Sequence, residues 1–237
     1  MHKIKILPET LAAAAKRRGG RQYAFPHIDA SKTALLVIDM QVYFMQPGMA
    51  AEVPAARDIV PNINRLAKSL RSKGGQVVWI KSTFDQNTSK TWSVMMHELF
   101  SRERREAMLE NLRAGSAGHQ LWPDFELGDE DWIVEKKRFS AFIQGSSDLE
   151  EKLKAAEIDT VIVTGTLTDV CCESTARDAM MLNFKTIVVS DANAAGCDDD
   201  HNQSLNALAR LWSDVVSSDD VISRISDGPD DTETGSS

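Results

Sequence analysis

The stretch TALLVIDMQ, residues 33–41, decides the fold, because an apolar run rich in β-branched residues ends abruptly at Asp39. Similar runs occupy residues 76–80, 160–164 and 186–190, and a shorter run covers residues 132–135. Continuous apolar runs of this length are typical of central strands in a parallel sheet that is covered on both faces.

Stretches with helical periodicity alternate with these strands. Residues 56–73 place four aliphatic side chains at spacings of three and four and stop at two glycines. Further helices are expected within residues 149–156, 171–182 and 202–212. The alternation predicts one α/β domain, a doubly wound, Rossmann-like parallel sheet with helices on both faces. Ligands of such sheets bind beyond the carboxyl ends of the strands.

The chain divides into three parts by composition. Residues 1–30 are expected to form an N-terminal arm, packed loosely against the domain or a neighbour, and residues 31–226 the main α/β domain. The acidic segment 227–237 is predicted to be disordered, because it contains too little apolar surface to pack. Residues 85–131 show no clear strand and are interpreted as a cover over the site, a subunit contact or a peripheral helical hairpin.

The overall charge argues against two classes of partner. The chain has 237 residues, a formal net charge of −8 and a sequence pI of about 5.2. Nucleic acids and anionic membranes require a basic patch, and the densest basic run, residues 102–105, is interpreted as a solvated helix face. We therefore expect neither a nucleic-acid nor a membrane partner, and no apolar stretch is long enough for a membrane span.

The cysteine content suggests free thiols. The three cysteines, at positions 171, 172 and 197, form neither a disulfide framework nor a CxxC pair for zinc. The first twenty residues place their apolar stretch before their basic cluster, the reverse of a signal peptide. A reducing cytoplasm is the expected compartment, where a thiol remains available for chemistry.

Three reactive side chains follow different predicted strands, so the topology would bring them to one edge of the sheet. They are Asp39, Lys136 and Cys171. Each type of residue is common at a strand end for structural reasons, but the combination has a chemical logic. An ammonium and a helix N-terminus favour the thiolate of a cysteine, and a carboxylate can accept its proton.

Three blocks of this sequence resemble the signature blocks of the isochorismatase-like cysteine hydrolases. They are ALLVIDMQ (34–41), EKKRFSAF (135–142) and VTGTLTDVCCESTARDA (163–179). Residues 190–192, Ser-Asp-Ala, are similar to a later strand ending of that family, and the resemblance extends over about residues 31–225.

The resemblance implies a catalytic triad, position by position. The aspartate that closes the first block is Asp39. The family lysine stands three residues before an aromatic residue, here Phe139, which selects Lys136, the first of two adjacent lysines. The nucleophile stands six residues after the glycine of the third block, Gly165, which selects Cys171, the first of two adjacent cysteines.

The resemblance also implies how the turn before the nucleophile is built. It places a cis peptide bond at Thr166–Leu167 and assigns the backbone N–H groups of Leu167 and Cys171 to an oxyanion hole. The neighbouring Cys172 is interpreted as a packed helix residue. Phe44, Ser82, Phe84 and Phe139 are candidate substrate-binding residues because they lie next to the triad blocks; Trp92 is a further candidate for closing the site, although a core or interface position is the simpler interpretation.

Departures from the family pattern narrow the expected chemistry. Nicotinamidases hold a metal with histidines near the second strand end, whereas residues 81–86 contain none and the five histidines lack metal-ligand spacing. No metal and no cofactor are therefore expected. The cysteine nucleophile favours amide over vinyl ether cleavage, and residues 115–123, GSAGHQLWP, are similar to carbamoylsarcosine and ureidoacrylate amidohydrolases.

These features predict a hydrolase of linear amides. It would cleave a small amide, carbamoyl or ureido C–N bond through a thioester acyl-enzyme. Alternatives are a hydrolase of an imide or ester with the same triad, a thiol redox or regulatory protein using Cys171, and a catalytically silent binding protein. Family members usually oligomerise, and residues 91–112 carry several Met, Leu and aromatic side chains outside the predicted sheet. A homodimer or homotetramer is therefore expected, with a lid over the chain's own site as the competing account.

Overall fold

A six-stranded parallel sheet forms the centre of the protein, in the order β4-β3-β2-β5-β6-β7. The computed structural model describes residues 1–226, so the predicted acidic tail lies outside the described residues. The strands are β2 (Thr33–Ile38), β3 (Gln76–Ser82), β4 (Trp132–Lys136), β5 (Thr160–Thr166), β6 (Lys185–Ala194) and β7 (Asp214–Val216). A separate parallel pair joins β1 (Ile28–Asp29) to β8 (Ile225–Ser226).

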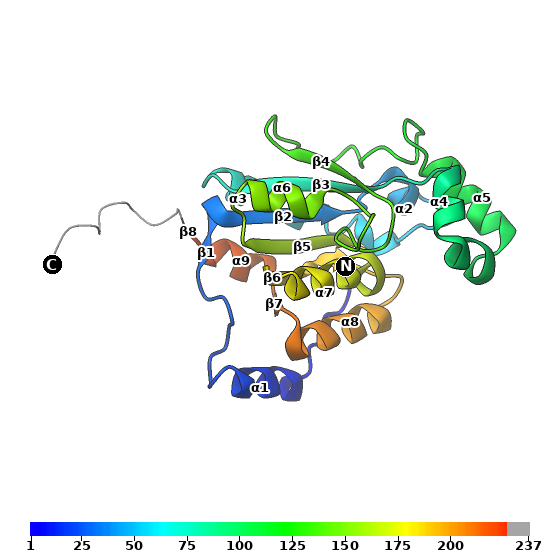
Figure 1. The fold of residues 1–237 in the computed structure, drawn as a ribbon. Coiled ribbons are helices and arrows are strands. Elements are labelled where there is room, and N and C mark those ends of the chain that lie inside the picture. Colours follow the sequence, from blue (N-terminus) through cyan, green and yellow to red (C-terminus); the bar gives the residue numbers. More distant parts are fainter. Residues whose placement is uncertain (227–237) are drawn as a thin grey trace.

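Helices cover both faces of this sheet, which confirms the doubly wound α/β prediction (Figure 1). One apolar core lies between the sheet and helices α3 (Val60–Arg71) and α9 (Ser218–Arg224). A second core lies on the opposite face, against α6 (Leu149–Ala155), α7 (Glu173–Met181) and α8 (Asp198–Leu211). Alternate residues of β2 enter the two cores, which explains why the whole strand is apolar.

Several element boundaries differ from the expected ones for local reasons. The α3 helix begins at Val60, because residues 54–56 form a separate 3₁₀ turn and Pro61 suits a first helical turn. Residues 168–172 form a π-helical turn, so α7 begins only at Glu173. The α8 helix begins four residues earlier than the expected 202, after an N-cap at Cys197.

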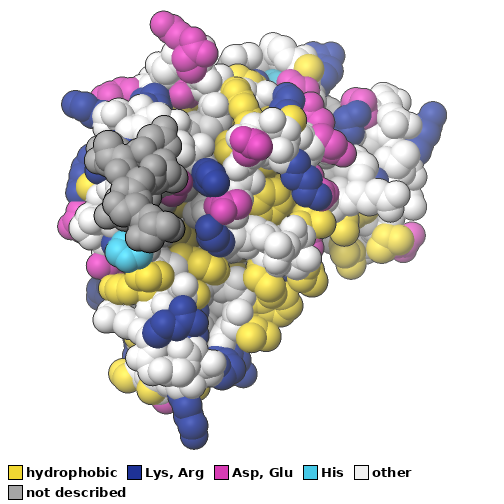
Figure 2. Space-filling model, turned by 60° about the vertical axis from the view of Figure 1, so that its left-hand side comes forward, with side chains coloured by type: hydrophobic (Ala, Val, Ile, Leu, Met, Phe, Trp, Pro, Cys, Tyr) yellow, Lys and Arg dark blue, Asp and Glu magenta, His cyan; other side chains and the backbone are white. Residues whose placement is uncertain are grey.

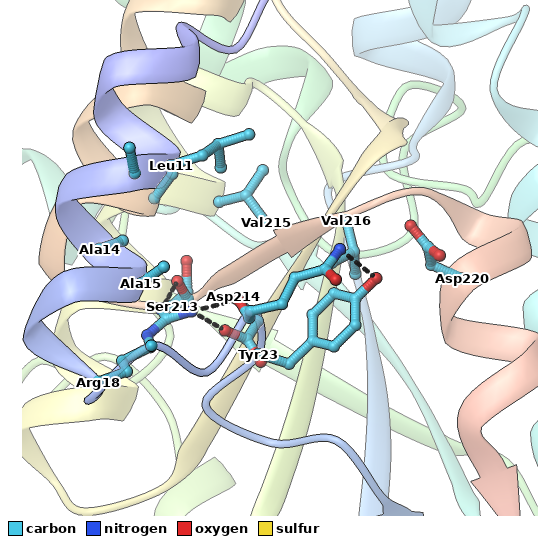
Figure 3. A pocket seen from close by; sticks show the side chains of 14 residues that line it. Leu11, Ala14, Ala15, Arg18, Tyr23, Ser213, Asp214, Val215, Val216 and Asp220 are labelled. Atoms are coloured by element: carbon cyan, nitrogen blue, oxygen red, sulfur yellow. Dashed lines mark hydrogen bonds and ion pairs between the residues drawn. The ribbon is translucent and has the colours of Figure 1, made fainter.

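The N-terminal arm is tied to the domain more closely than its composition suggested. Helix α1 (Pro8–Arg17) packs on α8, and the side-chain amides of Asn202 and Asn206 hydrogen-bond with the backbone of residues 3–7. Arg18 forms a 2.7 Å ion pair with the buried Asp214 of β7. Figure 3 shows this pair beside a cavity of about 440 Å³ between the arm and β7.

The segment between β3 and β4 is helical. It contains α4 (Gln86–Thr91), a π-helix (Val94–Leu99) and α5 (Arg102–Asn111). Together with α2 (Val42–Met45), α4 and α5 lie at the end of the sheet where β2 and β3 finish (Figure 1). Met95, Met96 and Met108 of this segment are buried in the core, whereas Val94 and Leu99 are largely exposed.

The surface carries both signs of charge. On the face shown in Figure 2, acidic and basic side chains are interspersed, with hydrophobic side chains between them. None of the helices in residues 1–226 combines the length and the apolar character that crossing a membrane requires.

Gly165 allows β5 to approach the end of β2 closely. It pairs with Ile38, the residue before Asp39, and adopts a φ of 115°, which side-chain-bearing residues rarely adopt. A Cβ atom at this position would lie 2.1 Å from the backbone oxygen of Ile38. The position of Asp39 therefore depends on the absence of a side chain at Gly165.

We expect Gly165→Ala to lower the free energy of unfolding by more than about 2 kcal/mol, because strain at positive φ adds to a backbone clash. Gly74→Ala is the matched control, because Gly74 also has a positive φ of 83° but a methyl group attached there would meet no atom within 4 Å. Urea unfolding of both variants measures the difference. Equal losses of unfolding free energy in the two variants would show that the close approach of β5 to β2 contributes nothing to stability.

Candidate active site

The ends of three strands bring Asp39, Lys136 and Cys171 together. Asp39 directly follows β2, Lys136 is the last residue of β4, and Cys171 lies in the π-helical turn after β5. The Nζ atom of Lys136 lies 2.8 Å from Oδ2 of Asp39 and 3.6 Å from Sγ of Cys171. All three side chains are buried, with exposed fractions of 0%, 0% and 4%. The ammonium thus stands between the carboxylate and the thiol.

Lys136 reaches this position from a strand that is not adjacent to β2. The intervening strand, β3, contributes Ser82, which lies opposite Lys136 in the register. Nζ of Lys136 donates hydrogen bonds to Oγ of Ser82 at 2.8 Å and to the backbone oxygen of Arg138 at 3.0 Å. These bonds direct the ammonium across β3 towards Asp39.

Asp39 has an unusual backbone conformation, with a φ of 53°. Aspartate tolerates this left-handed region better than most residues do. Its N–H donates to the backbone oxygen of Ile80 at 2.8 Å, which continues the contact between β2 and β3. Neither carboxylate oxygen accepts an aligned hydrogen bond from residues 1–226, although Oδ2 is in ion-pair contact with Lys136. The carboxylate is therefore available to accept a proton.

The pKa values of Lys136 and Cys171 define the resting state. Burial alone would lower the pKa of Lys136, but its contacts with Asp39 and Cys171, above all the negative charge of Asp39, outweigh burial and raise it. Burial, and then the charge of Asp39, raise the pKa of Cys171 far above its ordinary value, although Lys136 opposes them. The sequence led us to expect a stabilised thiolate. Instead, the raised pKa values favour a thiol at Cys171 beside the ammonium of Lys136.

Gln41 connects the elements around the site, a role that the motif alone did not reveal. Its Nε2 donates to the backbone oxygens of Ser82 and His119, and its Oε1 accepts from the N–H of Ser82 at 2.8 Å. The side chain is fully buried. Gln41 therefore holds together the end of β2, the end of β3 and the loop before β4.

A second buried residue that the sequence analysis missed, His201, supports the turn that carries Cys171. The Thr166–Leu167 peptide bond is cis. Oγ1 of Thr168 lies 2.8 Å from Nδ1 of His201, and Nε2 of His201 lies 3.1 Å from the backbone oxygen of Ser190. Since a backbone oxygen only accepts, Nε2 carries the proton and Nδ1 accepts from the threonine hydroxyl. A neutral His201 thus connects α8 to the turn.

A cavity of about 440 Å³ opens onto Cys171. All four substrate-binding candidates line it, together with Leu167 and Cys171: Phe44, Ser82, Phe84 and Phe139. Trp92 lies behind this wall, with its ring 4.7 Å from that of Phe139 and 6.2 Å from that of Phe84. The helical segment between β3 and β4 contributes lining residues that the sequence analysis did not identify: Phe100, Arg104 and Met108.

Comparison with known proteins identifies the family. The model of the isochorismatase domain matches residues 33–220, which is most of the chain. The chain belongs to the isochorismatase family. This assignment confirms the resemblance found in the three sequence blocks.

Individual relatives within the isochorismatase family carry different functional names. A probable inactive nicotinamidase of Arabidopsis thaliana is 30% identical over 175 residues, covering 73% of this chain and 86% of the relative. The ureidoacrylate amidohydrolase RutB of Stutzerimonas stutzeri is 29% identical over 175 residues, covering 69% and 70% of the two chains. A cysteine hydrolase of Pseudomonas syringae superposes with a TM-score of 0.73 at 27% identity, covering 85% and 95%. The protein is thus an isochorismatase-family cysteine hydrolase related to amidohydrolases.

Metal-binding residues are not assembled at this site. Within residues 1–226, no three side chains from histidine, cysteine, aspartate and glutamate come together as a metal-binding group. Nε2 of His119, in the loop before β4, lies 2.7 Å from Oγ1 of Thr83.

The burial of His201 predicts a pH-dependent stability. Burial, and then the charge of His2, lower the pKa of His201 from 6.5 to about 4. Between these two values the unfolded chain binds the extra proton, so stability falls as the pH decreases through this window, by up to about 3 kcal/mol. We expect His201→Gln, which stays neutral, to show a shallower decrease in urea unfolding between pH 7 and pH 4.5.

His97→Gln is the control for this measurement, because His97 is exposed. His119 contributes a decrease of the same sign, since burial lowers its pKa as well. The slope should therefore become smaller in His201→Gln without disappearing. An unchanged slope would mean that His201 is not held neutral in the folded protein.

Proposed function

We propose that this protein is a cysteine-dependent amidohydrolase that cleaves a small linear amide, carbamoyl or ureido C–N bond through a thioester. The observation that carries the proposal is the buried contact of Lys136 with both Asp39 and Cys171. A thiol, a carboxylate with free acceptor positions and an ammonium meet where a cavity of substrate size reaches the sulfur.

Acylation begins with the neutral thiol. Sγ of Cys171 bonds to the substrate carbonyl carbon while its proton passes to Asp39, and the carbonyl electron pair moves onto oxygen. The N–H groups of Leu167 and Cys171 are proposed to bind this oxyanion, and each such donor contributes roughly 3 kcal/mol in a well-placed oxyanion hole. Asp39 then returns the proton to the leaving nitrogen as the C–N bond breaks, and ammonia or an amine departs.

Deacylation uses the same carboxylate. Asp39 removes a proton from water, whose oxygen attacks the thioester carbon, and the C–S bond breaks. The sulfur takes the proton back from Asp39 and the acid product leaves. Lys136, whose pKa is raised by its contacts with Asp39 and Cys171, is proposed to act as an ammonium that balances the charge of the Asp39 carboxylate.

The geometry gives less support to a thiol redox function. Cys172 is fully buried and its Sγ lies 3.8 Å from the backbone oxygen of Thr164. Burial raises the pKa of Cys172 as well as that of Cys171. A redox pair would need a resolving cysteine with an accessible, low-pKa thiolate, and Cys172 is fully buried.

We expect Cys171→Ala and Cys171→Ser to abolish hydrolysis, whereas Cys172→Ala retains most of it. The reason is position, because only Cys171 lines the cavity and contacts Lys136. Ammonia release over a panel of ureido acids, carbamoyl amino acids and simple amides measures the effect.

The two cysteines serve as matched controls, since they are adjacent, buried and of the same type. Circular dichroism would verify that each variant is folded. An inactive Cys172→Ala beside an active Cys171→Ala would assign the chemistry to the other cysteine and contradict the mechanism.

A further inference from the structure

The catalytic cavity contains two polar groups that the proposed chemistry does not use. The first is the hydroxyl of Tyr43, a side chain that lines the cavity and is only 1% exposed. This hydroxyl has no hydrogen-bond partner among residues 1–226. Burial raises the pKa of Tyr43, although Arg104 opposes the shift, so the group stays a phenol that can donate. A buried donor without an acceptor is costly unless a ligand supplies one.

The second group is the guanidinium of Arg104, on α5 at the rim of the same cavity. It lies over the ring of Phe100, 4.8 Å from the centroid, and makes no ion pair or side-chain hydrogen bond with the described residues. The neighbouring arginines of α5, in contrast, have hydrogen-bonding partners. Arg102 pairs with Glu106 at 2.7 Å, and Arg105 donates to the backbone oxygen of Met96 at 3.1 Å.

The remaining charges of the cavity are neutralised. Glu52, the carboxylate that lines it, has one oxygen 2.8 Å from Arg57 and the other 2.8 Å from the N–H of Gly48. Lys136 does not line the cavity, and it is paired with Asp39. Among the described residues, Arg104 is therefore the uncompensated charge of the cavity lining, and it influences the buried donor of Tyr43.

We propose that Arg104 and Tyr43 bind a carboxylate at the end of the substrate remote from the scissile carbonyl. The substrate class would then be an amide, carbamoyl or ureido acid, and this assignment rests on the proposed function for the bond that is cleaved. The spacer between the two ends lies among the rings of Phe44, Phe84 and Phe139, so it is apolar. A guanidinium suits such a group because it binds a carboxylate through two parallel N–H donors.

The test compares acids with neutral partners of the same shape. The probes are 3-ureidopropionate against propylurea and succinamate against butyramide, with homologues of longer and shorter spacer. We expect wild-type kcat/KM to favour the acid by at least about tenfold, as expected for a hydrogen-bonded charge pair at a cavity rim. Arg104→Ala should bring this ratio close to one, Arg104→Lys should keep part of it, and Tyr43→Phe should lower it several-fold.

Arg102→Ala is the matched control, because Arg102 lies on the same helix but does not line the cavity. It should leave the ratio unchanged. An equal preference for acid and neutral probes in the wild type, or the same loss of ratio in Arg102→Ala, would overturn the proposal. An unchanged ratio in Tyr43→Phe would overturn the role of the hydroxyl.

A binding experiment can test the carboxylate site independently of the proposed hydrolysis. Calorimetric titration of Cys171→Ala with the acids measures carboxylate recognition without turnover. Saturable binding that Arg104→Ala weakens about tenfold supports the carboxylate site even if no probe is hydrolysed, a result that would count against the amidohydrolase alone. No Arg104-dependent binding of any acid in the series would overturn the carboxylate site, whatever the turnover.

Discussion

The buried contact between Lys136 and Asp39 is the interaction on which the rest of the site depends. Removing two charges from water costs several kcal/mol per ion, and the cost is offset only when the charges meet in good geometry. Here both side chains are fully buried and 2.8 Å apart. Loss of either partner would leave an uncompensated charge beside the thiol. The surrounding strands must therefore hold both side chains in contact.

The order of the strands makes this contact possible. Lys136 and Asp39 come from strands separated by β3, and the lysine reaches across it past Ser82. Gly165 lets β5 approach β2, which brings the turn with Cys171 to the same point. The left-handed conformation of Asp39 turns the chain at the end of β2. Together, these backbone features determine where the side chains of Asp39, Lys136 and Cys171 lie relative to one another.

The sequence predicted the parts of this fold that depend on short-range patterns. All five apolar runs form strands. Four of them are largely buried, whereas β4 alternates between exposed and buried positions, and the three-residue β7 is too short to show a pattern. The blocks that resemble the family indicated Asp39, Lys136 and Cys171, and their position at strand ends agreed with that choice. The raised pKa of Cys171 could not be foreseen, because burial is a property of the folded chain.

Residues whose roles depend on distant contacts were the ones that the sequence did not reveal. Gln41 contacts residues 41 and 78 positions away, and His201 contacts a residue 33 positions earlier. Arg104 belongs to a basic run that has the appearance of a solvated helix face, and only the placement of α5 separates it from Arg102 and Arg105. Such residues are recognisable from the contacts that tertiary structure creates, not from local spacing.

The central claim is that Cys171 carries the acyl group of the substrate. Intact mass spectrometry of enzyme quenched in acid during turnover, followed by peptide mapping, tests it most directly with any probe that releases ammonia. The account predicts a mass increase equal to the acyl group, located on the peptide that contains Cys171 and absent from Cys171→Ala. Turnover without an adduct on this peptide, or an adduct carried by Cys172, would contradict it.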